Sequence, residues 1–82
     1  MTPLALFTAA GWTPDDTPWS QYRKGEMVAL AISPRQSMLR RENWPEGGCT
    51  AWRFKAPDET LDFPTVEKLI KYATHYEGRK KG

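Results

Sequence analysis

The sequence contains only one cysteine, Cys49, and one histidine, His75, and this scarcity excludes several protein classes. One cysteine cannot form the internal disulfides on which small secreted scaffolds depend. One cysteine and one histidine are also too few for a structural zinc site, which takes about four ligands. We therefore expect a cytoplasmic chain that holds no metal and no cofactor.

Long hydrophobic runs are missing as well. The most apolar segment, residues 27–32, is much shorter than the roughly 18 residues that identify a membrane-spanning helix. The apolar stretch at residues 4–10 has no basic residue before it, whereas a signal peptide has a basic region there. The sequence thus predicts no association with a membrane.

Motifs that would indicate an enzyme are absent. Cys49 and His75 are the only candidates for a nucleophile and its base, and single residues of these types predict little. The glycines at 47–48 lack the following Lys-Ser/Thr of a phosphate-binding loop. The adjacent acids at 15–16 and 58–59 are typical of solvated turns. We expect that the chain is not an enzyme.

Aromatic side chains are abundant by contrast, since the 82 residues include 4 Trp, 3 Tyr and 3 Phe. Each such ring buries about 150–250 Å², so a few rings can build most of a small core. The net charge is only +2, but acids and bases alternate in blocks, which favours a patchy surface. We expect one globular domain over residues 1–82, with a basic, flexible tail at residues 79–82.

Two helices are predicted, one near each end of the chain. Thr2 and Pro3 are typical of a helix start, and Gly11 of a helix stop, which predicts a short helix over 3–10. Near the C-terminus an apolar stripe recurs every three or four residues, which predicts an amphipathic helix over 64–77. Gly78 is expected to end that helix. The stripe consists of Val66, Leu69, Ile70 and Ala73.

Between the helices the sequence predicts strands and hence an α+β fold. The apolar run at 27–32 is short and rich in β-branched residues, which favours a buried strand. Residues 19–23 are expected to pair with it across a tight turn at 24–25. A further strand is predicted over 49–55, with Trp52 and Phe54 in the core. We expect a small, mostly antiparallel sheet, containing 27–33 and 49–55, packed against the C-terminal helix.

Other segments leave alternatives open. Residues 33–36 resemble a capping box, which favours a helix through about Asn43. The segment is poor in apolar residues, however, so a strand over 37–42 fits almost equally well. Residues 55–62 are expected to form an acidic loop. The alternative fold is a four-helix arrangement in which 18–32 and 34–43 are helical.

The leading functional hypothesis is a small non-enzymatic module that binds another protein as an adaptor or inhibitor. Three tryptophans lie in or beside loops that contain proline, where complete burial is difficult. Tryptophan near arginine is typical of interface hot spots. The sequence is also compatible with a homo-oligomer. The predicted contact residues are Trp12, Trp19, Trp44, Arg40 and Arg41.

The alternative hypothesis is binding of nucleic acid through the basic C-terminal helix and tail. Cations along one side of a helix can follow a phosphate backbone. The solvated face of an ordinary amphipathic helix gives the same pattern, so the sequence alone does not separate the two. The residues concerned are Lys68, Lys71, His75, Arg79, Lys80 and Lys81.

Overall fold

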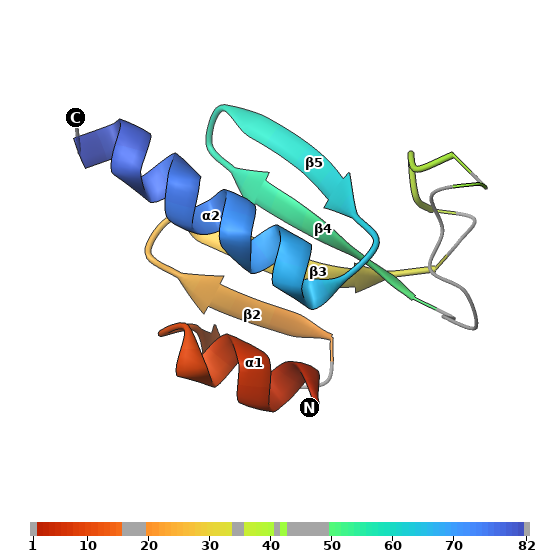
Figure 1. Cartoon of the computed structure of the whole chain (residues 1–82), viewed down its shortest axis with the longest axis horizontal. Coiled ribbons are helices and arrows are strands. Elements are labelled where there is room, and N and C mark those ends of the chain that lie inside the picture. The colour runs from red at the N-terminus through yellow and green to blue at the C-terminus, as the bar shows by residue number, and fades with distance from the viewer. Residues whose placement is uncertain (1, 16–19, 34–35, 41, 43–49, 82) are drawn as a thin grey trace.

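The computed structural model describes residues 2–15, 20–33, 36–40, 42 and 50–81. In this part of the chain five strands form one antiparallel sheet in the order β1-β2-β3-β4-β5 (Figure 1). The α+β prediction is confirmed, and the four-helix alternative is wrong, because residues 27–32 pair with a strand on each side. The elements are α1 (Pro3–Ala9), β1 (Thr13–Pro14), β2 (Gln21–Lys24), β3 (Met27–Ile32), β4 (Ala51–Ala56), β5 (Glu59–Phe63) and α2 (Val66–Lys81).

Both helices pack on the same face of the sheet. Phe7 of α1 stacks on Tyr22 of β2, with 4.3 Å between the ring centroids, and contacts Trp52 of β4 at 5.2 Å. On the same face, Phe54 of β4 contacts two tyrosines of α2. Trp52 and Phe54 are therefore buried as predicted. The core cluster comprises Phe7, Trp12, Tyr22, Met27, Ala29, Trp52, Phe54, Val66, Leu69, Ala73 and Tyr76.

A two-residue turn joins β2 to β3, one residue later than the sequence predicts. Lys24 pairs with Met27, so Gly25 and Glu26 form the loop. Gly25 has a φ of +60°, in the left-handed region that glycine adopts without a Cβ clash. Glycine at the first central position is typical of the hairpin turns whose twist matches that of the paired strands. This turn fixes the register of the central hairpin.

The prediction of an acidic loop over residues 55–62 is wrong, because β5 forms an edge strand there. Only residues 57–58 lie in a turn, between the paired ends of β4 and β5. The two acids of β5 accept hydrogen bonds from neighbouring elements, so their charge does not prevent pairing. Leu61, near the middle of the strand, is 38% exposed, which explains why β5 lacks the apolar pattern of a buried strand.

The C-terminal helix is longer than the sequence predicts. α2 begins at Val66, close to the expected start, but it continues through Gly78 to Lys81. Glycine inside a helix costs only about 1 kcal/mol relative to alanine. Beyond this glycine, Arg79 pairs with Glu59 of β5 at 3.5 Å. The contact holds the last turn beside the sheet, so the expected end at Gly78 is wrong and residues 79–81 continue α2.

The segment after β3 forms only half of the predicted capping box, because the Ser33 hydroxyl donates to Gln36 instead of accepting from its N–H. No helix follows it within residues 36–40. The side-chain Oε1 of Gln36 accepts from the backbone N–H of Ser33 at 3.0 Å, and the N–H of Gln36 donates to the carbonyl of Ser33 at 3.0 Å. The next turn is not completed, because the N–H of Met38 donates to the Asp62 carboxylate of β5 instead. These five residues are also not a strand.

Among the described residues, no helix combines the length and the apolar character that crossing a membrane requires.

Candidate functional site

The residues predicted to contact a protein partner do not form one surface in the part of the chain that the structure describes. Trp12 is only 3% exposed and packs edge-on against Phe7, with 5.4 Å between the ring centroids. Trp12 is therefore part of the core, which removes it from the candidate surface. Trp19, Trp44 and Arg41 lie outside the described residues.

Among the predicted protein-contact residues that the structure describes, Arg40 lies at the surface. Its side chain is 82% exposed, and its guanidinium lies 3.9 Å from the carboxylate of Glu42, whose side chain is 73% exposed. An ion pair this long and this accessible to water contributes little to stability. Arg40 is therefore accessible to a partner, and Met38, two residues earlier in the sequence, is also exposed.

The basic residues of α2, in contrast, come together. Lys68, Lys71 and His75 are separated by three and four positions, so they lie on one face of the helix. All three are exposed, and none forms an ion pair with an acid among the described residues. Tyr72 lies one helical turn from both Lys68 and His75, on the same side of the helix. The result is a basic face with an aromatic ring within it.

A hollow of about 400 Å³ opens beside this basic face, between α2 and the end of β5. We call it the α2–β5 hollow. The rings of Phe63 and Tyr72 supply the aromatic part of its lining, with 5.4 Å between their centroids and 38° between their planes. No acid belongs to the lining among the described residues. The hollow is lined by Phe63, Lys68, Lys71, Tyr72 and His75.

The Tyr72 ring is fixed from both sides. Its hydroxyl donates to the carboxylate of Glu59 on β5 and lies 3.2 Å from Nη2 of Arg79. Phe54 contacts the ring edge-on at 5.4 Å. The hydrogen bond to Glu59, together with burial and the Glu59 charge, raises the pKa of Tyr72 above its ordinary value, although Arg79 acts in the opposite direction. The hydroxyl therefore stays protonated, and the ring is held in place before any ligand arrives.

Arg79, which the sequence places in the nucleic-acid site, has partners within the fold. Its guanidinium lies 5.9 Å from the Tyr72 ring centroid and 5.6 Å from that of Tyr76, and it pairs with Glu59. Its role in the structure is to hold α2 against β5. The side chains of Lys80 and Lys81 lie outside what the structure describes. The candidate site is thus reduced to Lys68, Lys71 and His75 at the hollow.

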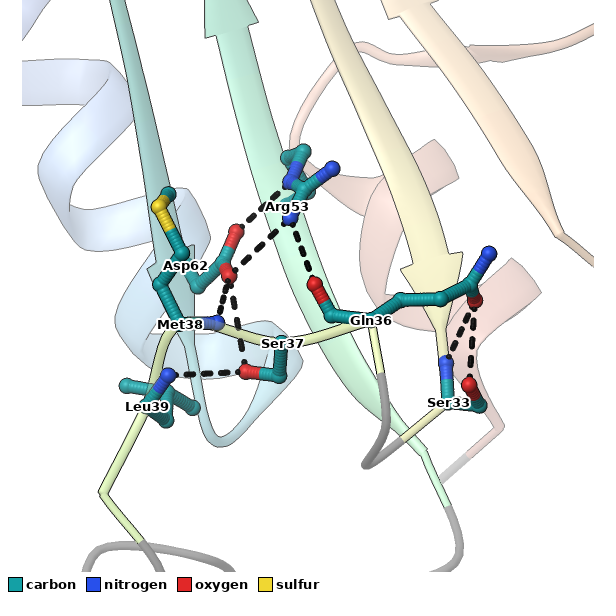
Figure 2. A network of polar contacts seen from close by, with 7 residues as sticks. All are labelled: Ser33, Gln36, Ser37, Met38, Leu39, Arg53 and Asp62. Carbon is teal, nitrogen blue, oxygen red and sulfur yellow. Dashed lines mark hydrogen bonds and ion pairs between the residues drawn. The ribbon is translucent and has the colours of Figure 1, made fainter.

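A second polar cluster lies on the opposite face of the sheet and is structural (Figure 2). The Asp62 carboxylate accepts from Nε of Arg53 at 2.8 Å, from the N–H of Met38 at 2.7 Å and from Oγ of Ser37 at 3.4 Å. Arg53 also donates to the carbonyl of Gln36 at 3.0 Å. The cluster ties the segment after β3 to the sheet.

The surroundings of Asp62 set its protonation. Its side chain is 2% exposed, and burial alone would raise the pKa of the carboxyl. The hydrogen bonds from Arg53, Met38 and Ser37, with the charge of Arg53, outweigh burial and hold this pKa below its ordinary value. Asp62 is therefore ionised and fully engaged, which leaves it no free proton for acid–base chemistry.

The described residues bring together no group of three or more His, Cys, Asp or Glu side chains that could hold a metal ion. Cys49 lies outside the described residues.

Sequence reasoning placed Lys68, Lys71 and His75 in a binding site but did not include the two rings of the hollow. Tyr72 follows Lys68 by four positions, which is the one signal that places a ring on the basic face. Phe63 reaches the site only because residues 59–63 form a strand beside α2. The chain matches no protein-family model, no curated protein and no solved structure.

Proposed function

We propose that this chain is a non-enzymatic binding module that binds nucleic acid through the basic face of α2 and the α2–β5 hollow. The observation that carries the proposal is the convergence of Lys68, Lys71 and His75 around an aromatic hollow with no acid in its described lining. Unpaired cations attract phosphates, and an aromatic ring offers a base a surface on which to stack.

The electrostatics favour an anionic polymer at this face rather than a neutral ligand. Neither Lys68 nor Lys71 is neutralised by an acid of the described chain. Each lysine that neutralises a phosphate releases condensed counterions from the polymer. Binding should therefore weaken as salt is added, with a log–log slope of about −0.7 for each phosphate neutralised on a single strand.

The salt dependence of a double variant tests this proposal. Fluorescence anisotropy with a labelled oligothymidylate would give the affinity over a series of salt concentrations. Lys68→Gln combined with Lys71→Gln should weaken binding at low salt and make the slope shallower by about 1.4, which is two phosphates at 0.7 each. Both side chains are exposed, so the variant should remain folded.

Lys55→Gln is the matched control. Lys55 is exposed on β4, and it points to the opposite face from the buried Phe54. The substitution removes one positive charge, against two in the test variant, and it leaves the hollow intact, so the slope should stay unchanged. No binding of any oligonucleotide at low salt, or an equal loss from Lys55→Gln, would contradict the proposal.

Protein binding, as an adaptor or inhibitor, is the second candidate, and exposure around residue 38 supports it. Met38 is 67% exposed, and two residues further on the Arg40 side chain is 82% exposed. Methionine and arginine are both enriched at protein interfaces. Affinity purification with and without nuclease would separate the candidates, since a direct protein partner survives nuclease. If the chain binds a protein through this region, the double variant Met38→Ala with Arg40→Ala should release the partner.

A further inference from the structure

We infer, on the basis of the proposed function, that the α2–β5 hollow receives an unstacked base, so that the chain binds single strands in preference to duplexes. The inference depends on three features of the hollow: its aromatic lining, the position of the lysines relative to that lining, and the fixed orientation of one ring.

The lining is suited to a flat ring. Phe63 and Tyr72 are both partly buried, so each leaves part of its surface open to the hollow. The hollow is shallow and open to solvent, so a flat ring can lie against these two side chains without being enclosed. In a duplex the faces of the bases are covered by their neighbours, whereas a single strand can turn a base outward to stack on aromatic side chains.

The charges are placed for the rest of the nucleotide. Lys68 and Lys71 are one helical turn apart, with about 5–6 Å between their Cβ atoms, and both contribute to the lining of the hollow. A nucleotide carries a flat ring and an anionic phosphate in one unit. A base in the hollow therefore brings its own phosphate, or that of the next nucleotide, toward these lysines. An apolar side chain of a protein would leave both cations without a partner.

The site needs little rearrangement to accept such a ligand. Tyr72 is anchored through its hydroxyl to Glu59 and through its edge to Phe54. Arg79 lies over the same ring, on the part of α2 that continues beyond Gly78. A ring held in this way loses little conformational freedom on binding, which favours affinity. The unexpected last turn of α2 thus supports the stacking surface.

Three ligands of equal length, measured against the unmodified chain, test the inference. They are oligothymidylate, the same backbone with abasic residues in place of the thymidines, and a duplex of oligothymidylate with its complement. The single strand with bases should bind about 5- to 150-fold more tightly than the abasic strand, the range expected for one stacked base. It should also bind more tightly than the duplex at equal salt.

The substitution Phe63→Leu gives a second readout with an apolar side chain of similar size. It should reduce the preference for oligothymidylate over the abasic strand while leaving the salt slope unchanged, because no cation is removed. Leu30→Val is the control, since Leu30 pairs with Arg53 on the face of the sheet opposite the hollow. Circular dichroism melting would confirm that the Phe63 variant is folded.

The outcomes distinguish the inference from the proposed function. Equal binding of all three ligands, with a slope that still depends on Lys68 and Lys71, would overturn the stacked base and leave nucleic-acid binding intact. No binding of any of the three at low salt would overturn both.

Discussion

Replacing Asp62 by Asn is expected to destabilise the fold by about 2–4 kcal/mol. Removing one partner of a buried ion pair typically costs about 3–5 kcal/mol. The lower range applies here because the Arg53 side chain is 25% exposed and can regain some hydration. For 82 residues the whole free energy of unfolding is about 4–12 kcal/mol, so this loss is a large fraction of it.

Urea unfolding of the Asp62→Asn variant, followed by circular dichroism, measures this loss, and the melting temperature should fall by roughly 10–25 °C. A pH series adds a second signature. Because the folded pKa of Asp62 lies below its unfolded value, the pair contributes its full stability above the unfolded pKa. That contribution disappears as the pH falls through the folded pKa. The variant should lack this part of the acid dependence.

Glu42→Gln is the matched control, because it removes a carboxylate that is 73% exposed and 3.9 Å from Arg40. Its cost should be below about 1 kcal/mol. A loss below about 1 kcal/mol for Asp62→Asn, or an acid dependence identical to that of the unmodified chain, would refute the assignment of this cluster as the tie between the segment after β3 and the sheet.

Two further substitutions test the core and the helix end. Tyr22→Phe should leave the free energy of unfolding unchanged or raise it by about 1 kcal/mol. The reason is that the Tyr22 hydroxyl is buried and forms no hydrogen bond with a described residue. A clear loss of stability in thermal melting would contradict this. Gly78→Ala should raise the free energy of unfolding by about 0.5–1 kcal/mol, because Gly78 lies inside α2 and nothing stands within 4 Å of the added Cβ. If Gly78 instead ended the helix in a left-handed conformation, alanine would destabilise.

Local patterns in the sequence were sufficient to predict the elements whose own residues determine them. The alternation of β4 and the stripe of α2 each place large side chains on a single face, and the structure buries those faces. The continuous apolar run of β3 predicts a central strand, and the structure pairs it with a strand on each side. The cap of α1 is equally local, since Oγ1 of Thr2 accepts from the N–H of Ala5 at 3.2 Å. These features define the α+β class without reference to distant parts of the chain.

The errors arose where partners distant in sequence decide the outcome. β5 forms because its acids find Tyr72 and Arg53 on other elements, which no pattern within residues 59–63 indicates. The half-formed capping box at Ser33 does not lead into a helix, because the N–H of Met38 donates to Asp62 instead. In each case a tertiary hydrogen bond outweighs the local preference.

In the candidate site, too, local spacing was predictable and contacts between distant segments were not. Helical spacing alone predicted that Lys68, Lys71 and His75 share a face. The hollow could not be predicted, because it exists only where β5 lies beside α2 and brings Phe63 next to Tyr72. Trp12 was misplaced for a related reason: its neighbours in the chain favour a loop, but Phe7 and the rest of the core bury its ring.

Backbone amide chemical-shift mapping by nuclear magnetic resonance, with oligothymidylate added to the labelled chain, tests the central claim most directly. If the basic face of α2 and the hollow bind the strand, the largest shifts will fall at Phe63 and over residues 68–75. Shifts centred on the opposite face of the sheet, around Arg23 and Lys55, or no shifts at low salt, would contradict this account.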